Sequence, residues 1–338
     1  MDQRVLARVC REIGVPDLVE RLSSRVSPSD LQAVLLELAR RRTARRSPAD
    51  IVEQYRRDGA VLADSQDARA LGRLAMAAFD AVPTYEAVEL SPVEPLGVNT
   101  VLAGLDQTSI LATARATEVV ADPTVALALH AAVRRRGELD PVRMCACHRV
   151  LRPQASDPSA LRHFRLFALV SATRSQADHV SEVEAMREHV QAHIAIAAAA
   201  REMGALIDRL VVRVSDTDVH RALVAEEIAV KADVTHPRDA MPNGATRRLG
   251  RRLRRLEAAV EALMSAAEAS NDTRVLVDLT RTEGVNYYDG LQLRIDAVHD
   301  GVQREVADGG SVDWMAKLLS DRHEQLFTSG AGLERLRA

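Results

Sequence analysis

Hydrophobic positions in the first 68 residues follow the spacing of short helices. After Ser27-Pro28-Ser29-Asp30, the apolar residues Leu31, Val34, Leu35 and Leu38 recur along one helix face. Ser47-Pro48-Ala49-Asp50 repeats the same start signal. In both, serine suits the N-cap, proline the first helical position and aspartate the first turn, where its charge meets the positive helix end. Residues 1–68 are therefore predicted to form a helical N-terminal segment.

From residue 69 the pattern predicts a mixture of helices and strands. Helices are expected over 71–82, 123–136, 181–206, 218–230, 245–269 and 314–326, and strands over 85–90, 144–151, 164–173, 209–214, 275–279 and 291–295. The polar stretch 152–162 joins two of these strands as a hairpin. Because strands and helices do not alternate with regular βαβ spacing, the expected fold is α+β, an antiparallel sheet flanked by helices. This second unit spans 69–338, with a helical insertion around 175–270.

Composition narrows the class of protein. The chain has 338 residues, of which 47% are hydrophobic and 3% aromatic, so it can bury a core made mainly of Ala, Leu and Val. A formal net charge of −3 provides no global basic field for nucleic acid. No stretch approaches the length of a membrane-spanning helix, and the first residues lack a signal-peptide pattern. With three cysteines and no disulfide framework, we expect a cytoplasmic protein without membrane contact.

The cysteine pair Cys145-Ala146-Cys147, followed by His148, lies on a predicted strand. Alternation puts both thiols on one face, opposite His148. Structural zinc usually takes CxxC turns, so we predict buried apolar thiols and no metal, with a metal ligand or a reactive thiol as the alternatives.

Two arginine clusters are candidates for phosphate or RNA contact. Arg40, Arg41, Arg42, Arg45 and Arg46 close one predicted helix, and Arg247, Arg248, Arg251, Arg252, Arg254 and Arg255 line another. Both are expected to be solvated faces, partly paired with acids such as Glu257 and Glu261. An RNA-binding protein that uses the second helix remains a weaker alternative, and a tRNA partner is not expected.

Six segments, in order, share the pattern of one family. Residues 283–290 read EGVNYYDG, residues 147–167 contain HRVLRPQ and RHFRLF, and residues 328–336 read TSGAGLERL. Residues 71–92, 121–124 and 309–313 fall at the places of three further motifs. Together they resemble the class II aminoacyl-tRNA synthetase catalytic core, closest to histidyl-tRNA synthetase paralogues with degenerate motifs. The chain stops three residues after Arg335, so an anticodon-binding domain is expected to be absent.

The resemblance implies a homodimer formed through residues 71–92 and a site for ATP, with Mg. It implies that Arg149 and Arg335 are catalytic, gripping the nucleotide from two sides, and that Phe164 stacks on adenine. Arg162 and His163 would reach the γ-phosphate from the loop. A small amino-acid-like ligand would contact Glu118, Asp122, Tyr287, Tyr288 and Asp289.

Departures from the family pattern are concentrated at polar positions. Leu151 stands where the family has an acid, and Glu283 where it has an arginine. Leu166 and Val170 replace the Gln and Glu that read histidine, and Ser311 and Val312 replace an Arg and a Tyr. A buried imidazole without partners costs about 1–3 kcal/mol for each lost hydrogen-bonding group. Histidyl-tRNA synthetase activity is therefore not expected.

Two functions follow from this balance of retained and lost groups. The first is a paralogue not acting in translation, which binds ATP and an amino-acid-like ligand and adenylates a carboxylate for transfer to a small molecule or carrier protein. The second is a catalytically inactive regulatory subunit, similar to that of ATP phosphoribosyltransferase, which acts on a partner enzyme. The sequence leaves open whether the protein is an enzyme, an ATP-dependent ligase if so.

Overall fold

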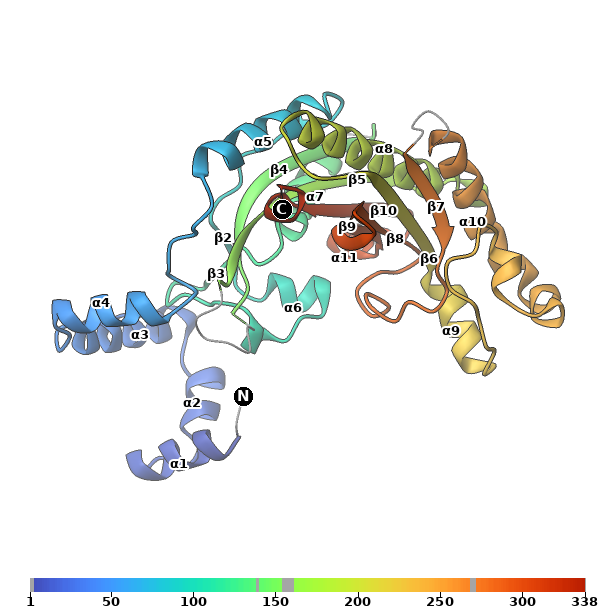
Figure 1. Ribbon diagram of the computed structural model, residues 1–338. Helices are drawn as coiled ribbons and strands as arrows, with labels where there is room; N and C mark the ends of the chain where they lie inside the picture. Colours follow the sequence, from blue (N-terminus) through green and yellow to red (C-terminus); the bar gives the residue numbers. More distant parts are fainter. Residues whose placement is uncertain (1–2, 138–139, 154–160, 268–271, 338) are drawn as a thin grey trace.

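A curved eight-stranded sheet forms the centre of the molecule (Figure 1). The computed structural model describes residues 3–137, 140–153, 161–267 and 272–337. In spatial order the strands are β1 (Glu86–Ala87), β4 (Val142–Leu151), β5 (His163–Arg174), β10 (Glu324–Gly332), β9 (Val302–Val312), β8 (Leu291–His299), β6 (Arg209–Asp216) and β7 (Thr273–Val277). The interior pairs are antiparallel, and the two edge pairs, β1 with β4 and β6 with β7, are parallel. The predicted α+β class is confirmed.

Long helices cover one face of this sheet. They are α5 (Ala68–Asp80), α8 (Val180–Glu202) and α10 (Asn243–Ala267), with the short α12 (Leu333–Arg337) beside them. Figure 1 shows α8 lying along the sheet. Because side chains alternate along a strand, Phe167 and Leu169 of β5 join this core, whereas Ala168 and Val170 point to the other face.

The second face is only partly covered. α7 (Pro123–Arg135) packs on β4 and β5, α11 (Trp314–Leu319) packs on β10 and α7, and α6 (Val98–Ala103) packs on α7 and α11, around the buried Trp314. A small two-stranded sheet, β2 (Val93–Pro95) and β3 (Thr117–Val119), adjoins them, with the 3-10 turn η1 (Gln107–Ser109) between. The remaining elements are α9 (Thr217–Ala225), η2 (Ala177–His179) and η3 (Pro237–Ala240).

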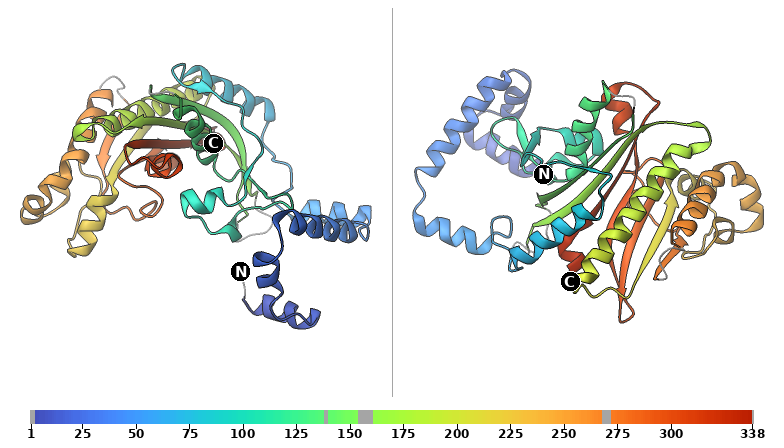
Figure 2. Two further views of the ribbon diagram at one scale, coloured as in Figure 1. Left: turned by 180° about the vertical axis from the view of Figure 1, so that it is seen from behind. Right: turned by 90° about the horizontal axis from the view of Figure 1, so that it is seen from above.

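The N-terminal helices extend away from the sheet (Figures 1 and 2). They are α1 (Gln3–Ile13), α2 (Leu18–Ser24), α3 (Pro28–Thr43) and α4 (Pro48–Arg57). The predicted caps form, since Ser27 accepts a 3.1 Å hydrogen bond from the Asp30 amide and Ser47 and Asp50 make a capping box. Among the described residues of these helices, Cys10 alone is buried. None of the helices described combines the length and apolar character needed to cross a bilayer.

Two C-terminal strands differ from the prediction. The helix expected over 314–326 is wrong beyond Leu319, because Ser320 adopts a left-handed conformation, with φ of 53°, and β10 begins at Glu324. Residues 302–312 form the long strand β9, for which no strand was expected. The helix expected over 218–230 also ends early, at Ala225. The division at residue 68/69 stays a prediction, although α5 begins at Ala68.

Candidate functional site

The open part of the second sheet face holds a cavity of about 680 Å³. Five residues expected at the site line it: Asp122, Phe164, Tyr287, Tyr288 and Arg335. They come from the start of α7, from β5, from the β7–β8 connection and from α12. The fold thus brings together groups that lie more than 200 residues apart in the sequence.

Asp122 is a fixed carboxylate in the cavity wall. It is the N-cap of α7, and its Oδ1 accepts hydrogen bonds from the Thr124 amide and hydroxyl at 3.0 and 2.8 Å. Its Oδ2 accepts a 3.0 Å hydrogen bond from the Tyr287 hydroxyl. Burial, reinforced by the Asp122 charge, holds the pKa of Tyr287 well above its usual value, so this hydroxyl keeps its proton and donates.

A guanidinium lies beside that carboxylate. Arg152 Nη2 is 3.8 Å from Asp122 Oδ2, and Arg152 Nε donates a 3.3 Å hydrogen bond to the Ala121 carbonyl. The Arg152 guanidinium carbon also lies 5.2 Å from the centroid of the Phe164 ring. Arg152 was not among the expected site residues, although it follows Arg149 by three positions within HRVLRPQ. The cavity wall therefore presents one positive and one negative group side by side.

The β7–β8 connection, which carries Tyr287 and Tyr288, also contains the buried guanidinium of Arg281. Arg281 is 7% exposed, and its Nη2 binds Asp308 at 2.9 and 3.0 Å. Its Nη1 donates a 3.0 Å hydrogen bond to the Leu293 carbonyl. Glu283 itself is exposed. Arg281 is not among the described residues that line the cavity, so it holds the β7–β8 connection in place and does not replace the cation missing at position 283.

Carboxylates surround the other end of the cavity. The Arg165 amide donates one bifurcated hydrogen bond to the two carboxylate oxygens of Glu334, at 2.9 and 3.0 Å. Arg335 lines the cavity, but its side chain is 61% exposed and its Nη1 lies 3.1 Å from Glu305. Counting both ends, four carboxylates and two guanidiniums line the described part of the cavity: Asp122, Glu305, Asp308, Glu334, Arg152 and Arg335.

Arg149 lies on the opposite face of β4 from the cavity. Arg149 and Cys145 are an even number of positions apart, so both side chains point to the face that the long helices cover. Arg149 is not among the described residues that line the cavity. Its Nη1 is 2.7 Å from His163 Nδ1, and its Nη groups are 3.8 Å from Asp64 and Glu334. The predicted convergence of Arg149 with Phe164 and Arg335 on one cavity is therefore not what the structure shows.

Arg162 and His163 contact the linker between the N-terminal helices and α5. The Arg162 amide donates to the Gly59 carbonyl at 3.1 Å, and His163 Nε2 lies 2.7 Å from the Leu62 carbonyl oxygen. Arg162 Nη1 is 4.0 Å from Asp58. Both residues belong to the segment that anchors this linker on the β4–β5 hairpin, outside the cavity lining.

Glu118 is buried behind the cavity with its hydrogen bonds made inside the protein. It accepts from the Gly97 and Asn99 amides at 2.7 and 3.2 Å, and from the Asn99 and Gln107 side chains at 2.8 Å each. Burial opposes its ionisation, yet these donors hold the pKa of Glu118 below its usual value. Burial raises the pKa of the adjacent Glu94 to about 7. Glu118 therefore positions the start of α6 and has no surface for a ligand.

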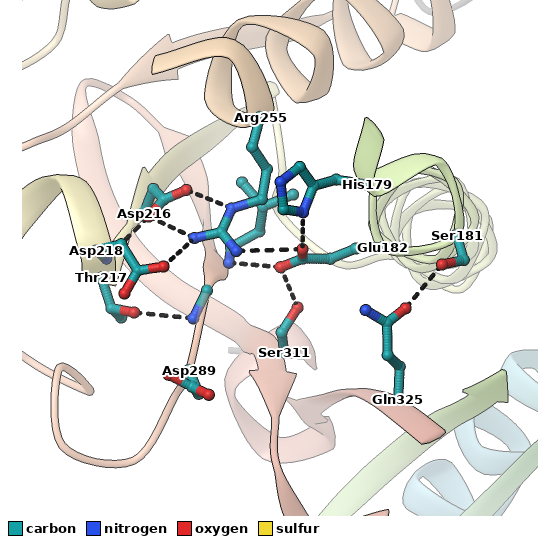
Figure 3. A network of polar contacts seen from close by, with 12 residues as sticks. His179, Ser181, Glu182, Asp216, Thr217, Asp218, Arg255, Asp289, Ser311 and Gln325 are labelled. Carbon is teal, nitrogen blue, oxygen red and sulfur yellow. Dashed lines mark hydrogen bonds and ion pairs between the residues drawn. The ribbon is translucent and has the colours of Figure 1, made fainter. Parts of the chain in front are cut away.

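Asp289 lies in a different cavity, of about 290 Å³, near the start of α8. Figure 3 shows the network there, with Arg255 held by Asp216, Asp218 and Glu182. The shortest of these contacts, from Arg255 Nε to Asp216, is 2.7 Å. Asp289 is 3.5 Å from Arg221. Of the arginine cluster on α10, Arg255 thus serves the fold, whereas its neighbours at 247, 248, 251, 252 and 254 are exposed.

The two strand cysteines pack toward the helical face. Cys145 is buried in that core, Cys147 packs against it, and burial raises the pKa of the Cys145 thiol to about 12. Elsewhere, Asp208, His299 and Asp300 bring three ligand atoms within 4.8 Å of one another on the surface. Asp208 already bonds His299 Nδ1 at 3.0 Å and the Asp300 amide at 2.9 Å, and we assign no metal to this group.

Comparison with solved structures identifies the fold. An ATP phosphoribosyltransferase regulatory subunit/histidyl-tRNA synthetase from Bacillus halodurans superimposes with a TM-score of 0.59 at 16% identity, covering 81% of this chain and 80% of that one. A histidine–tRNA ligase subunit from Alicyclobacillus acidocaldarius gives 0.54 at 18% identity, with 82% and 95% covered. Histidyl-tRNA synthetase from a Nostoc species gives 0.53 at 14% identity, with 80% and 71% covered.

Comparisons at the level of sequence gave no match. No protein-family description fits the chain, and no curated protein matches it. At identities below 20%, the structural likeness concerns the fold alone. The chain has a class II synthetase-like fold, of the kind seen in histidyl-tRNA synthetases and related regulatory subunits.

Proposed function

We propose that this protein binds a small α-amino acid or close analogue in the 680 Å³ cavity and acts outside translation. The observation that carries the proposal is the pair of opposite charges in the cavity wall, Asp122 and Arg152, 3.8 Å apart. A zwitterion carries an ammonium and a carboxylate on one carbon, so it can bind both groups at once. Charge-assisted hydrogen bonds of this kind are about twice as strong as neutral ones.

The hydrogen bonds and the exposure of the Asp122 carboxylate favour an ammonium ligand. Thr124 and Tyr287 donate to it and orient both of its oxygens. Its side chain remains 18% exposed, and that of Arg152 46% exposed, so both groups can be reached by a ligand. The surplus of carboxylates around the cavity adds a field that attracts a cationic group.

Calorimetric titration with amino acids tests this function. We expect saturable binding by the wild-type protein and at least a tenfold loss, about 1.4 kcal/mol, in Asp122→Asn, which keeps the shape and removes the charge. Asp289→Asn, in the other cavity, is the matched control and should bind like wild type. The absence of saturable amino-acid binding by the folded wild-type protein would overturn the proposal.

ATP-dependent activation of the carboxylate is a second candidate function. The observation in its favour is that Phe164, Arg152 and Arg335 lie in one cavity, an aromatic face with two guanidiniums. Phe164, Arg152 and Arg335 fit a nucleotide base and one phosphate. Four carboxylates line the same cavity, so its lining does not fit a triphosphate without a cation. Mg²⁺ would have to accompany the nucleotide. Amino-acid-dependent exchange of pyrophosphate into ATP, with Mg²⁺ present, tests this reading.

Lack of exchange in a protein that binds amino acids would favour the regulatory alternative. The amino acid would then act as a signal to a partner enzyme rather than as a substrate. Co-purification of the tagged protein with a catalytic partner, whose rate changes with the amino acid, is the result expected from that alternative. The homodimer through residues 71–92 stays part of both readings, and sedimentation equilibrium gives its mass.

A further inference from the structure

We propose that the amino acid bound by this protein has an apolar aliphatic side chain, which lies across β10 at Gly330 and against Leu166. The inference rests on the proposed function, because it takes the ammonium and carboxylate to be held by Asp122 and Arg152. It adds the chemical class of the remaining part of the ligand.

The floor of the cavity is bare backbone. Gly330 and Gly332 both line it and alternate together along β10, and Gly332 pairs across the ladder with Leu166 on β5. A Cβ added at Gly330 would meet nothing closer than the Phe167 carbonyl oxygen at 3.9 Å. The space above Gly330 is therefore free for a ligand.

Apolar side chains form part of the wall beside this floor. Leu166 lines the cavity and is half-buried, and it belongs to none of the three core clusters of the described residues. Leu105 and Ile110 line the same cavity from the connection between α6 and β3. Contact with a ligand would remove from water the apolar surface that Leu166 and Leu105 still expose.

Four hydroxyls among the side chains that line the cavity donate to protein partners. Thr124 and Tyr287 donate to Asp122, Ser109 donates to the Asp106 carbonyl at 2.6 Å, and Thr328 donates to the Gly310 carbonyl at 3.4 Å. Because these hydroxyls already donate their protons to protein partners, a carboxylate or the acceptor nitrogen of an imidazole placed here would lose its water without gaining a hydroxyl donor. These engaged hydroxyls and the four carboxylates of the cavity disfavour an acidic side chain, and the apolar walls favour one such as that of leucine.

Calorimetric titration with L-leucine, L-histidine and L-glutamate tests the inference on the full-length protein. We expect L-leucine to bind at least about tenfold more tightly than the other two, which is the discrimination one or two methylene contacts give. Leu166→Gln should reduce leucine binding at least about tenfold, with Leu206→Gln, an exposed leucine outside the cavity, as control. Gly330→Leu should abolish binding by filling the floor, and Gly250→Leu on α10, also with open space around it, should not.

The outcomes separate the two proposals. Equal binding of the three amino acids, each lost in Asp122→Asn, would overturn the apolar side-chain class and leave the proposed function standing. Preference for L-histidine or L-glutamate would overturn it as well. Failure of all three to bind would overturn the proposed function itself. The comparison among ligands needs only the wild-type protein, so the result does not depend on any variant folding.

Discussion

The buried ion pair between Arg135 and Glu324 fastens the end of α7 to the first residue of β10. The two side chains are 1% and 6% exposed, and Arg135 Nε and Nη2 donate to Glu324 at 2.9 and 2.8 Å. Arg174 lies 3.0 Å from the same carboxylate but is 46% exposed. The pair therefore holds the helix that presents Asp122 to the sheet.

Arg135→Met should destabilise the protein by about 3 kcal/mol, because it leaves the Glu324 carboxylate buried with one half-exposed partner. Urea unfolding followed by circular dichroism measures the change. Arg40→Met breaks an ion pair that is 71% exposed on the arginine side and should cost below about 1 kcal/mol. Equal losses in both variants would show that the buried pair has no special role.

The sequence predicts which types of residue form the site, but it does not predict which way their side chains point. Asp122, Tyr287 and Tyr288 were placed in the cavity because their segment carries a recognisable order of residues. Arg149 and Arg152 differ by three positions, an odd step, and an odd step along an extended chain reverses the side chain. The register in which β4 pairs with β5 decides whether Arg149 or Arg152 points into the cavity, and the sequence alone does not give that register.

At the scale of elements, α8 is joined to the sheet by a chain of buried hydrogen bonds. His189 is 0% and His193 3% exposed, and both bond the hydroxyl of Ser329, at 2.7 and 2.8 Å. His189 Nε2 also lies 3.0 Å from the Ser171 hydroxyl, which is 3.3 Å from the hydroxyl of Tyr85. Burial lowers the pKa of His193 to about 4 and that of His189 well below its usual value.

These two histidines should make the protein less stable in acid. Their folded-state pKa values lie below the unfolded value of 6.5, so the unfolded chain binds more protons. Stability is fully present above pH 6.5 and is lost as the pH falls toward 4. For His193 the loss reaches the order of 3 kcal/mol.

Unfolding free energies measured between pH 7 and pH 5, in wild type and in His193→Asn, isolate this effect. Glu94 acts in the opposite direction, since its raised pKa stabilises the fold at lower pH, and the difference between the two proteins removes its contribution. The variant should show a smaller fall in stability with acid. An identical pH profile in both proteins would contradict the assignment.

Strands β9 and β10 show why some elements escaped prediction. Their central residues, Asp308-Gly309-Gly310-Ser311 and Thr328-Ser329-Gly330, have the composition of turns. Gly309 is required by close approach, since an added Cβ would lie 2.6 Å from the Thr328 carbonyl oxygen. Such strands are held by pairing with distant neighbours, which local composition does not report.

At the scale of the whole molecule, the order of helices and strands was enough to predict an α+β fold with a helical N-terminal segment. The order of strands in space was not, because β10, the last strand in the chain, lies in the middle of the sheet. The direction in which the N-terminal helices extend was equally unpredictable, since it depends on contacts of the linker with residues 162–163.

Deletion of residues 1–57 should leave the rest of the protein folded. The helices α1 to α4 bury a single described residue, Cys10, so their removal exposes little of the core. The shortened chain, which keeps the linker at 58–67, should have a thermal midpoint within about 2 °C of the full chain. Differential scanning calorimetry measures it, and a fall of more than about 5 °C would show that these helices support the sheet.

The sheet ends in short parallel strands on both sides, and this has a consequence for behaviour at high concentration. β1 contributes two residues at one edge, and β7 contributes five at the other, where Val234 already bridges to Val277. Free amide and carbonyl groups on such edges are the template on which a foreign strand would grow. Since β1 and β7 are so short, a foreign strand has little length to pair with on either of them, and neither should nucleate the edge-to-edge stacking of fibrils.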